Sequence, residues 1–306
     1  MKAIVAVTDR DWFELLAAVN PPEVNFWQPS ASAEFKALAA GQPLLFKLHS
    51  PDNYIVGGGY FAHFSKIPVS LAWNAFGVRN GASSYGEMRR RIAKYRRGNG
   101  DPKEDYVIGC IILQDPFFLP RDQWIAPPAD FSPNIVRFKG YDLRTEVGRD
   151  LWDQVQAARL LGAKPIADIA ASGPMFSDPV LVRKRLHQGA FRVLITDMYE
   201  RRCAVTGERT LPVLEAAHIR PVAAEGIHSV DNGLLLRSDV HTLFDRGYVT
   251  ITPDCKFRVS RRLREDWQNG RVYYELDGRE IWVPKRTTDR PAKTALEWHS
   301  DTVFLG

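Results

Sequence analysis

One stretch of the sequence decides how the second half of the chain folds: LEAAHIRPVAAEGIHSVDNGLLLRSDVHTLFDRG, residues 214–247. It opens with an apolar, strand-like run that ends at His218, and Asn232 stands in a turn before a second apolar run. His241 and Asp245 are four residues apart, which places them on one face of a short helix. The order strand, loop, strand, helix therefore sets one histidine opposite a His/Asp pair.

The residue types in this order suit a reaction assisted by a metal ion. A divalent cation can be held by the His241/Asp245 pair, because imidazole nitrogen and carboxylate oxygen are common ligands of such cations. His218 then stays free of the metal and faces the substrate.

The surrounding motifs carry a resemblance to a known family. CAVTG (203–207) is followed in order by HIRP, which starts at His218, by DNGLLL, which contains Asn232, and by HTLFDRG, which starts at His241. This succession resembles the HNH nuclease family, whose ββα-metal fold is built from the same sequence order. The resemblance covers roughly residues 200–252, with His218, Asn232 and His241 in the H, N and H places.

The resemblance implies hydrolysis of phosphodiester bonds with one divalent metal ion, Mg²⁺ or Mn²⁺. His218 is then the general base that takes a proton from the attacking water, and an ordinary histidine pKa of about 6.5 suits that role. Asn232 orders the loop and fixes the imidazole rather than touching phosphorus. His241 ligates the metal with Asp245 as second ligand, and the product carries a 5′-phosphate.

Two departures from the family pattern concern the metals. Many members place an Asp or His directly before the first motif histidine as a further ligand, and this chain has Ala217 there. Other members hold a structural zinc with two CxxC pairs, but only Cys203 stands at such a place, so we expect no structural zinc. Glu215 is either a substitute ligand or an ion-pair partner of an arginine. Three further histidines match no motif place and are expected to have surface or packing roles: His187, His228 and His299.

Residues 1 to about 140 mix short apolar runs with turn signals, which is typical of an α+β domain with a strongly curved sheet. The glycine run 57–59 indicates a bulge or the close approach of another backbone or a ligand. The segments VNFWQPS (24–30) and LLFKL (44–48), with residues 53–59, are similar to PUA-like domains of the EVE and YTH type.

In such domains a curved sheet forms a pocket for a nucleotide flipped from its stack, so the resemblance implies that this half senses a base modification. Aromatic side chains with neighbouring amide or hydroxyl groups are the candidates for the pocket: Trp27, Gln28, Ser30, Asn53, Tyr54 and Trp73. The alternative stays open that these aromatic residues belong to the core, because the chain has eight Trp to bury.

The charge of the chain is modest, with 41 Lys and Arg against 36 Asp and Glu, but basic residues form local clusters. One lies on and just after the predicted helix 85–95 and is expected to bind DNA phosphates without reading the bases: Arg89, Arg90, Lys94 and Arg97. A second cluster lies within residues 256–264. A solvated helix face is the alternative for either cluster.

The length of 306 residues predicts two domains. We expect a PUA/EVE-like curved β-barrel domain with helices at 1–140, a helical linker at 141–182, and an HNH nuclease domain with an accessory C-terminal segment at 183–306. Three widely spaced cysteines support no disulfide framework. Without a long apolar run or a signal-peptide pattern, we expect a protein of the bacterial cytoplasm with no membrane partner.

The sequence as a whole predicts a modification-dependent DNA restriction endonuclease, which cuts double-stranded DNA near 5-methyl- or 5-hydroxymethylcytosine. Because one active site per chain must cut two strands, a homodimer or a transient dimer on DNA is expected. Two alternatives remain: a nuclease directed at RNA, and a non-catalytic nucleic-acid-binding protein with a decayed nuclease domain. Intact His218, Asn232 and His241 argue against the second alternative.

Overall fold

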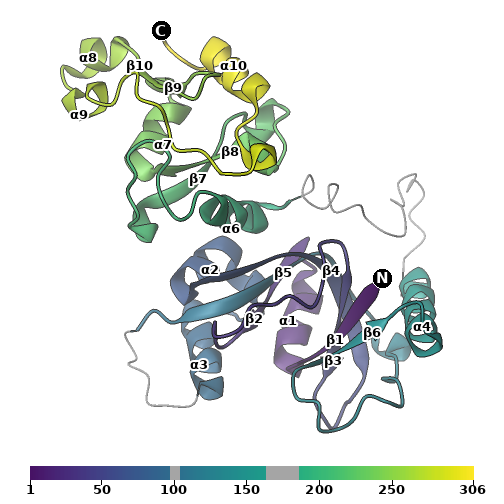
Figure 1. Ribbon diagram of the computed structural model, residues 1–306. Helices are drawn as coiled ribbons and strands as arrows, with labels where there is room; N and C mark the ends of the chain where they lie inside the picture. The colour runs from purple at the N-terminus through teal and green to yellow at the C-terminus, as the bar shows by residue number, and fades with distance from the viewer. Residues whose placement is uncertain (97–103, 163–185) are drawn as a thin grey trace. The chain divides into compact units, whose positions relative to one another are not determined.

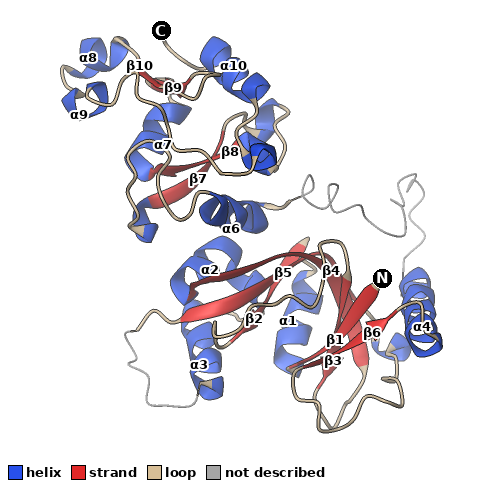
Figure 2. Ribbon diagram, in the orientation of Figure 1, coloured by secondary structure: helices blue, strands red, loops and turns tan. Residues whose placement is uncertain are grey.

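The computed structural model describes residues 1–96, 104–162 and 186–306. The chain divides into two compact units, residues 1–182 and 183–306, coloured purple to teal and green to yellow in Figure 1. Both units mix helices and strands (Figure 2), which confirms the predicted α+β class. Among the described residues, no helix combines the length and the apolar character needed to span a membrane.

A six-stranded sheet in the order β2-β5-β4-β3-β1-β6 forms the centre of the N-terminal unit. β1 and β3 are parallel, and the other neighbours are antiparallel. Register shifts along β4 bend the sheet. β2 and β6 stay at the two edges, so the hydrogen-bonded strands of the described residues do not close into the predicted barrel. The strands are β1 (Lys2–Thr8), β2 (Glu23–Gln28), β3 (Pro43–Leu48), β4 (Ile55–Pro68), β5 (Val107–Phe118) and β6 (Phe138–Asp142).

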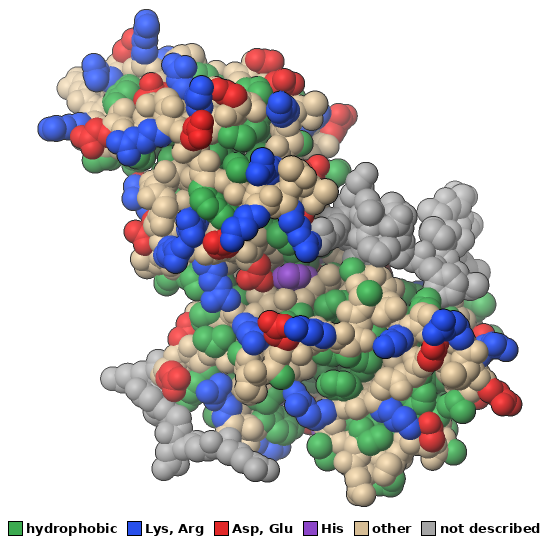
Figure 3. Space-filling view, in the orientation of Figure 1, with side chains coloured by type: hydrophobic (Ala, Val, Ile, Leu, Met, Phe, Trp, Pro, Cys, Tyr) green, Lys and Arg blue, Asp and Glu red, His purple; other side chains and the backbone are tan. Residues whose placement is uncertain are grey.

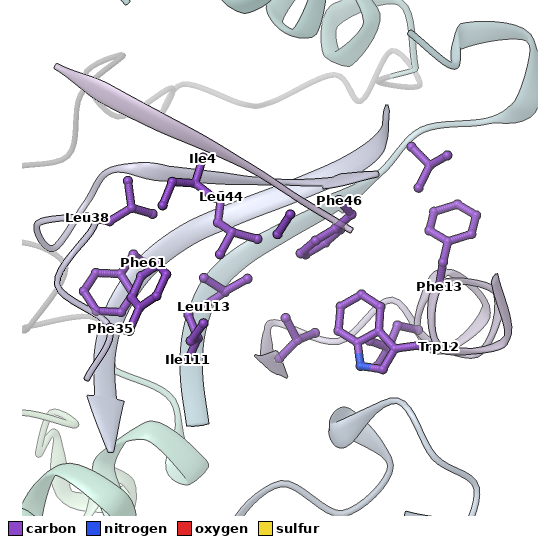
Figure 4. Close-up of a cluster of buried hydrophobic side chains, with 14 of the residues drawn as sticks. Ile4, Trp12, Phe13, Phe35, Leu38, Leu44, Phe46, Phe61, Ile111 and Leu113 are labelled. Carbon is purple, nitrogen blue, oxygen red and sulfur yellow. The ribbon is translucent and has the colours of Figure 1, made fainter. Parts of the chain in front are cut away.

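Both faces of this sheet are buried. Alternation along β1 sends Ile4 to one core cluster and Val5 to the other, and the central strands are apolar on both sides as a result. On the first face, Trp12 and Phe13 of α1 lie near Phe46 (Figure 4), with the Trp12 and Phe46 rings 5.0 Å apart. The helices are α1 (Arg10–Val19), α2 (Val69–Phe76), α3 (Tyr85–Tyr95) and α4 (Glu146–Gly162).

The expected linker at 141–182 is wrong in its first part. β6 pairs with β1 at the sheet edge, with Tyr141 opposite Ala3. α4 buries Leu151, Trp152 and Val155 in the second core cluster. Its helical periodicity is visible in the sequence, but whether the apolar face packs onto its own domain depends on distant strands. The remainder of the predicted linker, 163–182, lies outside the described residues.

The glycine run lies in β4, where neighbouring backbones approach closely and where the register with β5 also shifts between Gly58 and Tyr60, so both features that the sequence offered as alternatives occur here. A Cβ atom at Gly57 would lie 2.3 Å from the carbonyl oxygen of Phe117, and one at Gly58 would lie 2.8 Å from that of Leu44. A side chain at either position would therefore collide with an adjacent strand.

The C-terminal unit is built around a short hairpin and the helix that follows it. β7 (Leu214–His218) pairs with β8 (Gly233–Arg237) in antiparallel fashion, with His218 opposite Gly233. α7 (Ser238–Asp245) follows β8 directly, and Gly233 packs against Phe191 and Ile195 of α6. The other elements are α6 (Gln188–Met198), β9 (Val249–Ile251), β10 (Phe257–Val259), α8 (Arg262–Trp267), α9 (Arg271–Tyr274) and α10 (Lys293–Thr302).

Candidate functional site

A cleft of about 660 Å³ opens in the C-terminal unit, between α6, the end of β7, α7 and α10. His218, His241 and Asp245 all line it, so the structure brings these three predicted residues together. The cleft is also lined by Glu215, whose role the sequence left open, and by His228 and His299, for which it predicted surface or packing roles.

His218 stands at the end of β7, held by rings on two sides. Its imidazole is stacked on Phe191 of α6, with ring centroids 4.0 Å apart and planes 9° apart. Its Nε2 lies 2.9 Å from Nδ1 of His228. Burial lowers the pKa of His218 to about 4, and the nearby His228 and His241 act in the same direction. His218 is therefore neutral at pH 7 and has a lone pair to accept a proton.

Asn232 acts on the loop that joins β7 and β8. Its side-chain amide donates to the carbonyl oxygens of Arg220 (2.9 Å) and Ile227 (3.0 Å). Its Oδ1 accepts from the backbone N–H of Arg220 at 2.9 Å. The side chain is only 6% exposed, and these three bonds tie the start of the loop at Arg220 and its middle at Ile227 to its end at Asn232.

His241 on α7 lies between two carboxylates. Its Nδ1 is 2.7 Å from Oε2 of Glu215 on β7, and its Nε2 is 3.3 Å from Oδ2 of Asp245, one helical turn on. Burial raises the pKa of Asp245, with Glu215 adding to the rise and His241 opposing it. The bond to Glu215 fits the tautomer that carries its proton on Nδ1, which leaves the Nε2 lone pair on the side of Asp245.

The donor set of this pair fits a divalent cation. Two ligand atoms that each lie about 2.1 Å from one cation at right angles are about 3 Å apart, close to the His241–Asp245 spacing. Imidazole ligands of metals usually donate their other N–H to a carboxylate, as His241 is placed to do toward Glu215. Across the described ranges, no group of three or more His, Cys, Asp or Glu has the arrangement of a metal site.

Of the remaining histidines, His299 has the packing role that the sequence predicts, and His228 has a different role. His299 is buried, stacked on Phe244 at 3.6 Å, and hydrogen-bonded to Thr250 Oγ1 and to the Phe244 carbonyl, as its expected packing role requires. His228 instead faces His218 in the cleft. Its only sequence signal is its place in a loop that begins after one motif residue and ends at another, Asn232.

The residues of the predicted base pocket are spread over the N-terminal unit. Trp27 lies on β2, and its indole N–H donates to the carbonyl oxygen of Asn80 at 2.9 Å. Gln28 follows on the same strand, Ser30 is exposed just after it, and Trp73 on α2 packs near Tyr85.

Asn53 and Tyr54 lie at the far end of β4. Trp27 is in register with Cys110 of β5 and, through it, with Ser65 of β4. Asn53 and Tyr54 come before Ile55, ten residues earlier on that strand, which corresponds to roughly 30 Å of extended chain. The structure therefore does not gather the six residues at one place along β4.

The predicted phosphate contacts divide between two faces of α3. Arg90 and Lys94 are exposed one turn apart, whereas Arg89 lies over the rings of Tyr85 and Tyr106 and donates to the Glu104 carbonyl. Arg97 lies outside the described residues. Elsewhere basic and acidic side chains alternate over the visible surface (Figure 3), so no broad patch of one sign stands out in that view.

A known protein family matches the segment that contains the cleft residues His218, His241 and Asp245. Residues 203–252 match the family model of the HNH endonuclease. No curated protein matches the chain. The chain is similar to the ASCH protein from Zymomonas mobilis, at 14% identity and a TM-score of 0.35, over 49% of this chain and 94% of that one.

Two restriction endonucleases of known structure are also similar. The modification-dependent TagI enzyme has 13% identity and a TM-score of 0.27, over 92% of this chain and 75% of that one. The type IV phosphorothioation-dependent enzyme ScoMcrA has 12% identity and a TM-score of 0.22, over 78% and 49%. All these TM-scores are below 0.5, and the structural likenesses carry no argument here.

Proposed function

We propose that this chain, which carries an HNH endonuclease domain at residues 203–252, is a modification-dependent DNA restriction endonuclease. One observation carries the nuclease part: His218, His241 and Asp245 line a single cleft within the matched segment. A phosphodiester strand entering the cleft meets a neutral imidazole on one side and an imidazole–carboxylate pair on the other.

His218 is the general base of the proposed reaction. It takes a proton from water, whose oxygen forms a bond to phosphorus while the bond to the leaving 3′-oxygen breaks. The low pKa keeps its imidazole unprotonated at neutral pH. Asn232 acts indirectly, because its three bonds hold the loop against which His218 is placed.

His241 and Asp245 are the residues that would hold a divalent cation, Mg²⁺ or Mn²⁺. When bound, the cation stabilises negative charge on the non-bridging and leaving oxygens. Glu215 is a positioning residue in this proposal, because it accepts from Nδ1 of His241 and turns Nε2 toward Asp245.

The N-terminal unit is proposed to select the substrate. Its residues 24–30, 44–48 and 53–59 resemble PUA/EVE-like domains, which supports recognition of a flipped 5-methyl- or 5-hydroxymethylcytosine. Arg90 and Lys94 offer two exposed charges for DNA phosphates. Cutting both strands calls for two copies of the chain, in a stable or a transient dimer.

Digestion of matched plasmids tests both parts of the proposal. Plasmids with plain, methylated or hydroxymethylated cytosine are incubated with Mg²⁺, Mn²⁺, Co²⁺ or Ni²⁺, alongside a matched RNA. We expect metal-dependent cleavage of a modified plasmid and its loss in His218→Ala. Equal cleavage of plain DNA would overturn modification dependence, and preferential cleavage of RNA would overturn the DNA assignment. Unchanged cleavage by His218→Ala would overturn the base.

A further inference from the structure

His228 makes a contact with the proposed base that the motifs do not account for. Besides the 2.9 Å contact between its Nδ1 and Nε2 of His218, the two rings lie 4.8 Å apart at 68°. Phe191 packs near both, stacked on His218 and 5.9 Å from His228. The His218 ring is thus held on its face by a phenyl group and at its edge by a second imidazole.

The nitrogen–nitrogen contact constrains where the protons are. Two imidazole nitrogens at this distance need one N–H between them, because two lone pairs would repel and two protons would clash. The tautomer of His218 is therefore set together with that of His228. A base whose proton is misplaced presents the wrong nitrogen to water, and the orientation of its ring matters equally.

The loop is built to hold His228 in this place. The side-chain amide of Asn232 donates to the carbonyl oxygen of Ile227, the residue just before His228, as well as to that of Arg220. Ser229, just after His228, donates its backbone N–H to the same Ile227 carbonyl at 2.9 Å. The histidine thus stands on a short, cross-bonded turn that the motif asparagine anchors.

We propose that His228 is a positioning residue for His218: its Nδ1 accepts from the Nε2–H of the base, which leaves the lone pair on Nδ1 of His218 to accept a proton from water and fixes the orientation of the ring. This inference rests on the proposed role of His218 as the base. It also gives the motif asparagine a further task, because Asn232 places His228 through the Ile227 carbonyl.

The experiment replaces His228 with side chains that either keep or lose a polar atom at the position of its Nδ1. In His228→Asn the side-chain amide nitrogen or oxygen comes near the position of Nδ1, whereas in His228→Gln it comes near that of Nε2. Each variant, with His228→Ala and His218→Ala, is assayed as the full chain on the plasmid that the wild type cuts best. His187→Asn makes the same chemical change at a histidine that does not line the cleft.

We expect kcat to fall by about 10- to 100-fold in His228→Ala and His228→Gln with KM nearly unchanged, as for other residues that orient a catalytic group. His228→Asn should recover most of the loss, and His187→Asn should match the wild type. A role in folding alone predicts no such difference between Asn and Gln at position 228.

Two results would overturn the inference while leaving the proposed function intact: wild-type kcat in His228→Ala when His218→Ala is inactive, or equal defects in the Asn and Gln variants. If His218→Ala is fully active, the proposed base fails instead. The ¹⁵N shifts of the His218 ring give a readout that needs no substrate. They should report one dominant tautomer in the wild type and in His228→Asn, and a mixture in His228→Ala; the same mixture in all three would also overturn the inference.

Discussion

The two units of the chain each contain a group of polar residues that the sequence assigns to one site, and only one group assembles. In the C-terminal unit, His218, His241 and Asp245 meet in one cleft. In the N-terminal unit, Trp27 on β2 lies level with Ser65, near one end of the long strand β4, and Asn53 lies just before the other end of that strand. Residue pattern and family resemblance together suggested both groups, so the difference has a structural cause.

The cause is how far apart in the sequence the elements lie that bring each group of residues together. The cleft residues belong to one hairpin and the helix that follows it. In this hairpin β7 pairs with β8, and His218 lies opposite Gly233. Such short-range geometry follows from strand register and helical periodicity. The N-terminal candidates are placed by a six-stranded sheet whose order, β2-β5-β4-β3-β1-β6, no local pattern encodes.

The largest effect that we expect comes from breaking the assembled group. His241→Ala removes the imidazole between Glu215 and Asp245 and should reduce metal-dependent cleavage at least about 100-fold, with a weaker response to added Mn²⁺. Plasmid cleavage across a metal titration measures both effects. Thr242→Ala, on the same helix but away from the cleft, is the control. Wild-type metal dependence in His241→Ala would remove this residue from the proposed metal pair.

The same contrast explains which features the sequence predicts and which it does not. The motif order predicts that a strand ends at His218 and that His241 and Asp245 share a helix face, because both depend on neighbours in the chain. The packing of α4 and the contact of His228 with His218 depend on partners from other elements. Helical periodicity identifies α4 as a helix but does not say which core receives its apolar face.

The second effect concerns the anchor of the assembled group. Asn232→Ala leaves the buried carbonyls of Arg220 and Ile227 without this donor, and we expect about 2–3 kcal/mol of lost stability in the C-terminal unit. Hydrogen exchange of the 219–232 backbone and urea denaturation measure it. Asn232→Asp keeps the acceptor for the Arg220 N–H but loses both donated bonds, so its stability should be close to that of Asn232→Ala. An Asp variant as stable as the wild type would contradict the importance of the donated bonds.

The third effect is a pH dependence of stability, and it is expected in the C-terminal unit. Burial lowers the pKa of His299 to about 4, below the value of about 6.5 expected in the unfolded chain. The unfolded state therefore binds the proton first, and stability falls as pH drops from about 6.5 toward 4. We expect His299 to account for about 2 kcal/mol of lost unfolding free energy between pH 7 and pH 5.

Urea denaturation at the two pH values, with His299→Gln and His187→Asn side by side, measures this contribution. The Gln variant should be less stable than the wild type at pH 7, since it loses the stacking on Phe244, but its stability should fall less on acidification. His187→Asn should keep the wild-type difference between the two pH values. The same pH difference in His299→Gln as in the wild type would assign the acid sensitivity to another group.

The smallest effect tests what the N-terminal unit contributes without an assembled pocket. Arg90 and Lys94 are exposed one turn apart on α3, and if they contact phosphates, removing both should weaken DNA binding only several-fold at physiological salt. The slope of log affinity against log salt should fall by about 2, because each phosphate contact contributes about 0.9. The loss should be equal for plain and modified DNA, since phosphate contacts position the duplex without reading the bases. Lys36→Ala, an exposed lysine paired with Glu34, should change neither quantity. A loss confined to modified DNA would mean that this helix takes part in reading the base.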